Sequence, residues 1–266
     1  MTVRTGRIRR KWRARERAFG AAIQLPSPDL VEVVGAAGYD YAWLDAEHGC
    51  FSLSDLRNLI RAADAVGIDS IVRVPNHDPS YIQRVLDLGA AGIMAPHVRS
   101  VDETKALVAA ARYSPGGIRG ACPFIRSVNH VSLDWKADYT AADEDVIVLG
   151  LIEDVEGMEN VEAIAAVPGL DGLVYGPFDL GMALGYHGDV SQPELRAQHD
   201  RVVAACRAAS IDYVTAGVDW EFGAYPDTGS RLVTVVSDRG TVYAAFNSAL
   251  VNVKALADNP APSYSI

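Results

Sequence analysis

The chain has no uninterrupted apolar run close to the roughly 18 residues that a membrane-spanning helix needs. It also has only three cysteines, Cys50, Cys122 and Cys206, and they lie far apart. An odd number of widely spaced cysteines forms neither a disulfide framework nor a zinc-binding pattern. The sequence therefore predicts a protein of the reducing cytoplasm that has no membrane association.

Basic residues are also scarce, with 24 Lys and Arg against 34 Asp and Glu and a net charge of −10. Such a surface repels a phosphate backbone, which argues against nucleic acid as a partner. The exception is the N-terminus, where residues 1–20 hold eight basic residues and one acid, Glu16. We expect residues 1–18 to form a basic arm or leading helix, with a transit peptide as the alternative.

The composition otherwise suits a folded chain, because 49% hydrophobic residues over 266 positions can bury a sizeable core. Short apolar runs alternate with stretches of helical periodicity, and no Pro- or Ser-rich linker divides them. The eight strand-like runs are Phe19–Gln24, Tyr41–Asp45, Ser70–Val74, Gly92–Pro96, Val146–Ile152, Gly172–Tyr175, Tyr213–Gly217 and Leu232–Val236.

These runs are rich in Val, Ile and Leu, as in parallel strands buried on both faces. Eight strand–helix units predict an α/β fold, a single-domain (β/α)8 barrel over residues 19–256 with a tail at 257–266. An open nucleotide-binding sheet is disfavoured, because no glycine-rich loop follows the first strand. We expect the longest irregular stretch, Ser114 to Asp145, to lie at the barrel mouth.

Polar residues indicate where the intervening helices begin and end. Ser54-Asp55 predicts a helix start, and Ser100 followed by Glu103 resembles a capping box. Val155–Ala166 is expected to be one helix that ends before Pro168-Gly169.

Barrel enzymes place their chemistry at the carboxyl ends of the strands. In this sequence those ends carry carboxylates, an arginine and histidines: Asp45, Glu47, His48, Arg73, His97, Glu153, Asp179, Asp219 and Asp238. An isolated Asp after a strand is most often a helix cap, which is the role we expect for Asp219 and Asp238. Surface positions are expected for His77, His130, His187 and His199.

Two of the carboxylates, Glu153 and Asp179, follow neighbouring strands. Converging carboxylates attract hard divalent cations such as Mg²⁺ or Mn²⁺. Gly176-Pro177 allows a close backbone approach, so that the amides of Phe178 and Asp179 can bind a substrate carboxylate. A Schiff-base mechanism is disfavoured, since Lys105, Lys136 and Lys254 do not end any strand.

Several separated strings carry a family resemblance, which runs from about Phe19 to Leu256. They are Asp45-Ala46-Glu47-His48-Gly49, Ile71-Val72-Arg73-Val74-Pro75, Tyr113-Ser114-Pro115-Gly116-Gly117-Ile118-Arg119-Gly120, Ile152-Glu153 and Gly176-Pro177-Phe178-Asp179-Leu180. Their order and spacing resemble the HpcH/HpaI aldolase/citrate lyase family of metal-dependent class II pyruvate aldolases. The resemblance implies a barrel of the phosphoenolpyruvate/pyruvate type, a last helix exchanged between neighbours, and a homo-oligomer, either a trimer or a hexamer.

The resemblance also implies a role for each matching residue. Glu153 and Asp179 match the two protein ligands of a divalent metal ion, Mg²⁺, Mn²⁺ or Co²⁺. Arg73 matches the arginine that holds the keto oxygen, and His48 matches the acid–base histidine, which pairs with the aspartate matched by Asp87. Asp45 and Glu47 match acids that shape the site, and Gly176, Pro177, Phe178 and Asp179 match the segment that binds the substrate carboxylate.

The sequence departs from the family pattern at a few positions. Leu151 replaces a common glutamine, and Phe178 and Gly181 replace the usual alanine and serine. His97 stands where an apolar residue is commoner, and the loop from Cys122 to Ser127 differs too. We expect His97, Phe124 and Arg126 to shape the pocket of the acceptor aldehyde.

The resemblance implies reversible aldol cleavage of a 4-hydroxy-2-oxo acid to pyruvate and an aldehyde, through an enolate that the metal ion and Arg73 stabilise. Oxaloacetate decarboxylation and Claisen-type cleavage of an acyl-CoA are alternatives. For the acyl-CoA, Arg99, Arg112, Arg119 and Arg126 are candidate phosphate ligands. A non-catalytic protein that binds a keto acid is an alternative of another class.

Overall fold

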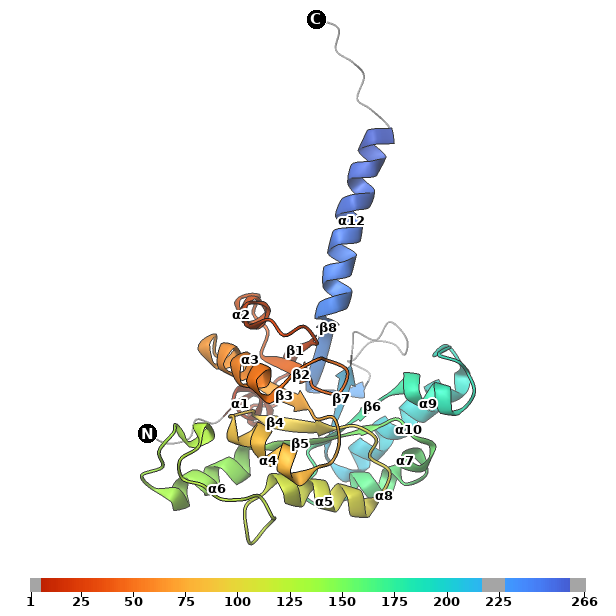
Figure 1. Ribbon diagram of the computed structural model, residues 1–266. Coiled ribbons are helices and arrows are strands. Elements are labelled where there is room, and N and C mark those ends of the chain that lie inside the picture. The colour runs from red at the N-terminus through yellow and green to blue at the C-terminus, as the bar shows by residue number, and fades with distance from the viewer. Residues whose placement is uncertain (1–5, 217–227, 259–266) are drawn as a thin grey trace, which may run out of the picture.

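The computed structural model describes residues 6–216 and 228–258, and these form a closed barrel of eight parallel strands in sequential order (Figure 1). All eight predicted strands are present, with ends that shift by a residue or so. Their bounds are β1 Ala18–Ile23, β2 Tyr41–Asp45, β3 Asp69–Arg73, β4 Gly92–Ala95, β5 Ile147–Ile152, β6 Gly172–Tyr175, β7 Asp212–Ala216 and β8 Leu232–Ser237. The predicted (β/α)8 fold is confirmed. Gly217 and Asp219 lie outside the described residues.

Helices surround the barrel and return the chain from the carboxyl end of one strand to the start of the next (Figure 1). They are α1 Arg7–Arg13, α2 Pro28–Ala36, α3 Leu53–Ala65, α4 Pro79–Asp87, α5 Val101–Ala111, α6 Trp135–Asp145, α7 Val155–Glu159, α8 Val161–Ala165, α9 Pro177–Ala183, α10 Pro193–Ala209 and α12 Asp238–Asp258, with a short 3-10 turn, η1, at Arg126–Val128.

Two helix predictions need correction. Helix α3 begins two residues earlier than Ser54-Asp55 suggests, because Ser52 and Asp55 form a reciprocal capping box. The single helix expected over Val155–Ala166 is two short helices, which meet at Asn160.

The strand side chains divide into two apolar layers. One set points outward and packs against the helices. The other set fills the barrel and includes Trp43, Ile71, Met94, Leu151 and Val174. Because side chains alternate along a strand, the inward positions nearest the carboxyl end continue this series. These positions belong to Asp45, Arg73 and Glu153, which therefore lie directly above an apolar floor.

The N-terminal basic segment is partly structural. Helix α1 closes the amino end of the barrel with Ile8 and Trp12, which are buried beneath the strands. Its charges also have partners: Arg9 pairs with Asp171 at 2.6 Å, and Lys11 pairs with Asp40 at 2.7 Å. Residues 1–5 lie outside the described part of the chain.

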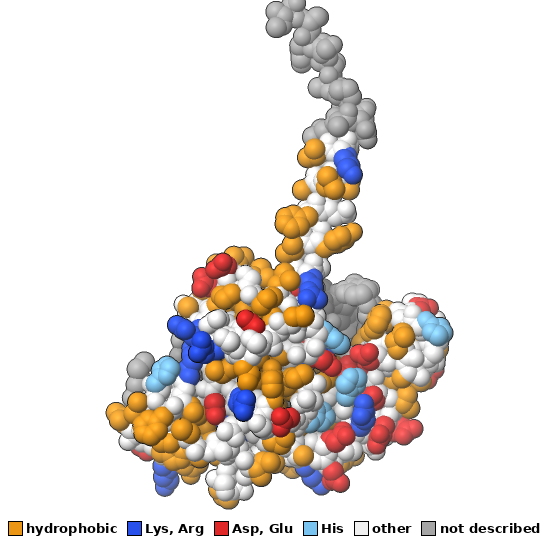
Figure 2. Space-filling model, in the orientation of Figure 1, with side chains coloured by type: hydrophobic (Ala, Val, Ile, Leu, Met, Phe, Trp, Pro, Cys, Tyr) orange, Lys and Arg blue, Asp and Glu red, His pale blue; other side chains and the backbone are white. Residues whose placement is uncertain are grey.

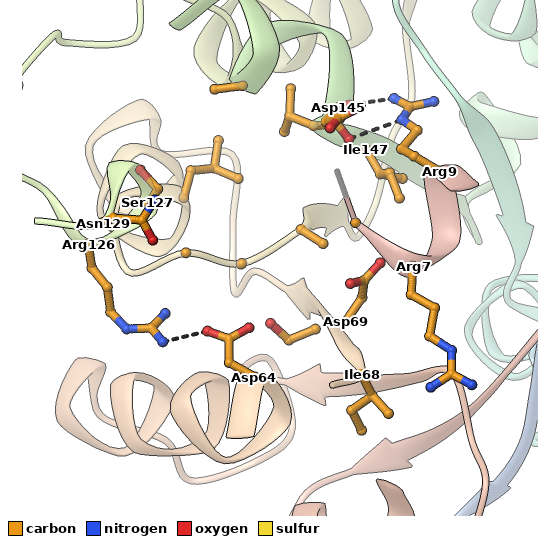
Figure 3. A pocket seen from close by; sticks show the side chains of 18 of the residues that line it. Arg7, Arg9, Asp64, Ile68, Asp69, Arg126, Ser127, Asn129, Asp145 and Ile147 are labelled. Atoms are coloured by element: carbon orange, nitrogen blue, oxygen red, sulfur yellow. Dashed lines mark hydrogen bonds and ion pairs between the residues drawn. The ribbon is translucent and has the colours of Figure 1, made fainter. Parts of the chain in front are cut away.

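The expected position of the long irregular segment is wrong. Ser114 to Asp145 follows helix α5 and precedes strand β5, so it lies at the amino end of the barrel, opposite the mouth. It includes α6 and borders a cavity of about 440 Å³ between α1 and the starts of β3 to β5 (Figure 3). Several charged residues around this cavity are paired, as Arg126 is with Asp64.

Helix α12 extends away from the barrel instead of packing against its outer wall (Figure 1). The cap role expected for Asp238 is wrong: it is the buried first residue of the helix, and Ser237 Oγ before it accepts the N–H of Gly240 at 3.3 Å. The Oδ2 of Asp238 accepts hydrogen bonds from the backbone amides of Gln24 and Leu25 at 2.9 and 2.8 Å. The helix is therefore anchored to the end of β1. Among the described residues, no helix is long and apolar enough to cross a membrane, and residues 259–266 lie outside them.

Candidate active site

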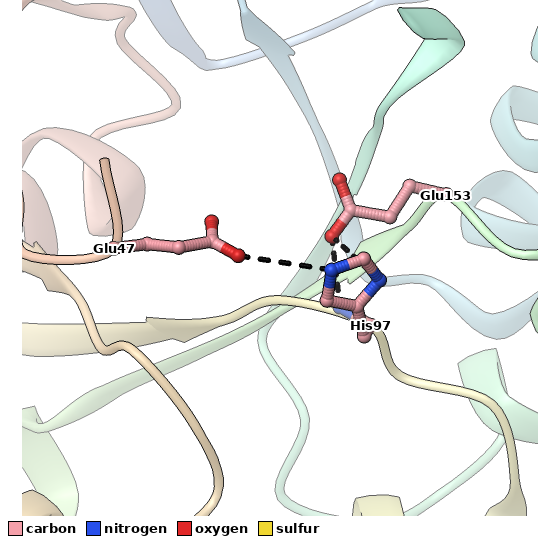
Figure 4. A group of neighbouring side chains, drawn as sticks. All are labelled: Glu47, His97 and Glu153. Atoms are coloured by element: carbon pink, nitrogen blue, oxygen red, sulfur yellow. Dashed lines mark hydrogen bonds and ion pairs between the residues drawn. The ribbon is translucent and has the colours of Figure 1, made fainter. Parts of the chain in front are cut away.

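Four neighbouring strands each deliver a polar residue to the barrel mouth. Glu47 lies in the turn after β2, Arg73 ends β3, His97 follows β4 and Glu153 follows β5. Their side chains converge although up to 106 positions separate them in the sequence. Figure 4 shows Glu47 and Glu153 pointing toward His97 from opposite sides.

Arg73 is held by a pair of acids. Its Nε and Nη2 donate to the two oxygens of Asp45 at 2.9 and 2.5 Å, and its Nη1 lies 2.9 Å from Glu47 Oε2. The guanidinium also lies 5.5 Å from the ring centre of Trp43, which belongs to the apolar floor. Burial opposes ionisation of Asp45, but its hydrogen bonds with Arg73 and the arginine charge hold the pKa of this carboxyl below its usual value.

Glu153 is buried, with only 3% of its side chain exposed. Among the described residues, no Lys or Arg lies within 4.0 Å of its carboxylate, and its Oε1 accepts the backbone N–H of His97 at 2.9 Å. Burial raises the pKa of Glu153 to about 7, and the nearby charges of Glu47 and Asp179 add to this effect. Only glycine fits at Gly176, since a Cβ there would lie 2.7 Å from Glu153 Oε2.

Glu47, His97 and Glu153 form the group of ligand-type side chains at the mouth. One ligand atom of each lies within 4.8 Å of the others. The Nε2 of His97 is 3.7 Å from Glu47 Oε1, and its Nδ1 is 3.5 Å from Glu153 Oε1. Glu47 Oε2 is buried and accepts no hydrogen bond of good geometry. A partly buried, electron-rich group of this kind is suited to a cation.

Other predicted residues lie at the rim. His48 is exposed, and its Nε2 is 3.8 Å from Glu47 Oε2. Asp179 and Phe178 are exposed in the first turn of α9. The backbone amides of that first turn have no partner within the helix, as at any helix start. The expected ligand and carboxylate-binding roles of this segment stay predictions.

Three expected site residues lie away from the mouth within one chain. Asp87 ends α4, at the amino end of the barrel, where its carboxylate accepts a hydrogen bond from Arg119 at 2.8 Å. Arg126 donates to the carbonyl oxygen of Leu88 at 2.8 Å, and Phe124 is exposed on the same segment. Their expected roles with His48 and the acceptor aldehyde therefore need a second copy of the chain.

Comparison of the chain with known protein families is consistent with a barrel of this kind. The sequence profile of the HpcH/HpaI aldolase/citrate lyase family matches residues 20–244. The chain belongs to the HpcH/HpaI aldolase/citrate lyase family.

Two curated relatives of this family member are aldolases. A 5-keto-4-deoxy-D-glucarate aldolase of Klebsiella pneumoniae is 34% identical over 85% of this chain and 88% of its own. A 2-dehydro-3,6-dideoxy-6-sulfogluconate aldolase of Pseudomonas putida is 31% identical over 89% of this chain and 92% of its own. A solved family structure from Burkholderia cenocepacia is 32% identical, with a TM-score of 0.85 over 93% of this chain and 98% of that one.

Sequence reasoning missed two residues around the site of this HpcH/HpaI family member, Gln24 and Asp154. Gln24 donates from its Nε2 to Asp45 Oδ2 at 2.7 Å. Asp154 lies 3.1 Å from His97 Nδ1 and is in turn contacted by Arg99 at 3.2 Å. Gln24 ends a predicted strand and Asp154 follows Glu153, so the strand-end rule that found the other residues also reaches these two.

Two further positions differ from expectation or from the family pattern. His199 is buried in α10 and packs edge-on against Tyr175 and Tyr213, so its predicted surface position is wrong. Leu151, the family's common glutamine position, is buried inside the barrel two residues below Glu153. A leucine there extends the apolar floor and offers the site no hydrogen bond.

Proposed function

We propose that this protein is a divalent-metal-dependent carbon–carbon lyase that cleaves a 4-hydroxy-2-oxo acid to pyruvate and an aldehyde, and condenses them in reverse. The observation that carries the proposal is the arrangement of Arg73, held by Asp45, next to the buried Glu153 at the barrel mouth. Positive charge at Arg73 and an anionic pocket beside it suit a keto acid and a cation together. The aldolase relatives support this reaction class.

The residues present fit a divalent ion. Glu153 is buried without a Lys or Arg partner among the described residues, and ligand atoms of Glu47 and His97 lie within 4.8 Å of its carboxylate. A charged carboxylate buried in this way is costly unless a cation compensates it. Glu153 and Asp179 are the proposed protein ligands, and a divalent ion bound there would supply positive charge to the carboxylate and keto oxygens of the substrate.

Arg73 has N–H groups left for substrate. A guanidinium carries five donors, of which Asp45 takes two and Glu47 faces one. The remaining donors can bind the keto oxygen as it gains negative charge on the way to the enolate. Because Asp45 and Trp43 already fix the arginine, little reorganisation is needed during the reaction.

His48 is the proposed acid–base group. Its exposed imidazole lies at the rim beside Glu47, where it can move the methyl proton of pyruvate directly or through a water molecule. Within one chain Asp87 is at the far end of the barrel, so pairing of these two residues would occur between neighbouring copies.

The exposed apolar face of helix α12 supports an assembly of several copies of the chain. Tyr243, Phe246, Leu250 and Val253 follow helical spacing on α12 and are between 54% and 73% exposed. Figure 2 shows apolar side chains along this helix, which stands clear of the barrel. We propose that a second copy of the chain covers this face, as an exchanged last helix would, in a homo-oligomer.

The acyl-CoA alternative is disfavoured by the positions of its candidate arginines. Arg112, Arg119 and Arg126 lie at the amino end of the barrel and pair there with Asp171, Asp87 and Asp64, respectively. Only Arg99 lies at the mouth, where it contacts Asp154. No basic groove for CoA phosphates forms at the mouth among the described residues.

The test is deuterium exchange of the pyruvate methyl group in D₂O, followed by NMR with and without Mg²⁺ or Mn²⁺. We expect metal-dependent exchange in wild type and in Glu156→Ala, an exposed control on α7, and none in Glu153→Ala. Cleavage of 4-hydroxy-2-oxo acids, measured as pyruvate release, then identifies the aldehyde. Absence of exchange with every metal, together with oxaloacetate decarboxylation or keto-acid binding alone, would overturn the aldolase proposal in favour of those alternatives.

A further inference from the structure

His97 has an unusual backbone for a residue with a side chain. Its φ is 52°, in the left-handed region that side chains other than Asn, Asp and His seldom adopt. The conformation is held by the hydrogen bond from its backbone N–H to Glu153 Oε1 at 2.9 Å. This bond fixes the imidazole beside the buried carboxylate of Glu153.

The ring orientation of His97 is fixed from the side away from Glu47. Its Nδ1 lies 3.1 Å from Asp154 Oδ2, and Arg99 holds that carboxylate through contacts of 3.2 and 3.3 Å. In the tautomer that donates from Nδ1 to Asp154, the Nε2 keeps its lone pair. That nitrogen lies 3.7 Å from Glu47 Oε1, too far for a good hydrogen bond.

An Arg–carboxylate–imidazole chain is the usual support of a metal-ligating histidine, because the outer carboxylate fixes the tautomer and makes the free nitrogen more basic. Two independent features indicate a ligand here. Glu153 is 97% buried without a Lys or Arg partner among the described residues, and Glu47 Oε1 faces the Nε2 of His97 at 3.7 Å.

We propose that His97 is a nitrogen ligand of the divalent metal, in addition to Glu153 and Asp179, with Asp154 and Arg99 as the pair that supports its ring. This inference rests on the metal site of the proposed function and adds a ligand to it. It has a consequence for metal choice. Carboxylates alone suit Mg²⁺, whereas an imidazole favours Co²⁺ and Zn²⁺ over Mg²⁺.

The experiment uses Mn²⁺ as a spectroscopic probe on the full-length protein. Electron spin-echo envelope modulation detects the ¹⁴N nucleus of an imidazole bound to Mn²⁺, whatever the catalytic activity. We expect this signal in wild type and its loss in His97→Asn, since Asn tolerates the left-handed backbone. His48→Asn tests the other histidine near the cluster, and His187→Asn is a control at another exposed histidine with positive φ. Both should keep the signal.

Metal affinity gives a second readout. Calorimetric titration should show that His97→Asn weakens Co²⁺ binding by roughly 10–100-fold or more, and that Asp154→Ala weakens it within that range. Mg²⁺ binding should change much less in His97→Asn. A wild-type protein that binds Mn²⁺ without a nitrogen signal, or a signal that disappears only in His48→Asn, would overturn the proposal.

These experiments distinguish a failure of the His97 proposal from a failure of the aldolase proposal. Deuterium exchange of pyruvate without a ¹⁴N imidazole signal would support the lyase proposal and show that His97 does not bind the metal. A ¹⁴N signal from His97 without pyruvate exchange or aldol cleavage would support the metal site and contradict the lyase proposal.

Discussion

The carboxylate of Asp45 and the guanidinium of Arg73 form a two-point contact across neighbouring strands, with hydrogen bonds of 2.9 and 2.5 Å. Both side chains are nearly buried, with exposures of 4% and 11%. A buried pair of this kind contributes geometry more than net stability, because desolvation offsets much of its attraction. Its importance for function is that it presents the remaining N–H groups of Arg73 in one fixed direction.

Asp45→Asn should therefore destabilise the protein by about 3–5 kcal/mol, because it removes the buried carboxylate charge that binds Arg73 at two points. Gln24→Leu should cost less, about 1.5–3 kcal/mol, since it removes one hydrogen bond to Asp45 and no charge. Chemical denaturation at one protein concentration measures both. Equal losses in the two variants would show that Asp45 is not the main support of Arg73.

Arg73→Ala should lower kcat of aldol cleavage by about 100- to 1,000-fold, as does removal of a donor that faces a developing negative oxygen. Mn²⁺ affinity should change much less, because Arg73 does not ligate the metal. Steady-state kinetics and Mn²⁺ titration measure the two effects. Arg61→Ala, at an exposed position on α3, is the matched control. Near-wild-type turnover in Arg73→Ala would remove this residue from the mechanism.

The stability of the metal-free protein should fall as pH rises. The pKa of Glu153 is about 7 in the folded protein, above its ordinary value of 4.5, so the folded state binds this proton more tightly than the unfolded chain does. The contribution of the Glu153 proton to the free energy of unfolding is complete below pH 4.5. It is lost as pH approaches 7, which lowers the stability by up to about 3 kcal/mol. Thermal unfolding in a chelator should show a smaller decline between pH 5 and 7.5 in Glu153→Gln. An equal decline of the unfolding temperature with pH in wild type and variant would contradict this prediction.

Leu250→Asp should reduce the size of the assembly. It places a charge on the exposed apolar face of α12, where a second copy would otherwise bury it unpaired. Light scattering on size-exclusion fractions measures the mass. Asn252→Asp adds the same charge on the opposite side of the helix and should leave the mass unchanged. An unchanged mass in Leu250→Asp would remove α12 from the interface.

The sequence by itself determined the barrel and the residues at its mouth. Apolar runs without alternation can be buried only in a sheet covered on both faces, so eight of them with intervening helices leave few architectures. The parallel order then brings the carboxyl ends together. For that reason Glu47, Arg73, His97 and Glu153 could be named from local patterns alone, before any contact between them was known.

Other features depended on the tertiary structure. The sequence does not indicate whether a long segment belongs to a strand–helix or a helix–strand connection until the helices are placed. The position of the segment from Ser114 to Asp145 was therefore wrong, and with it the expected location of Arg126 near the mouth. Similarly, only the packing of separate strands shows that Glu153 lacks a Lys or Arg partner and that Asp154 orients His97. Pairing and burial are properties of distant residues in contact, and these contacts decide which strand-end residues can perform chemistry.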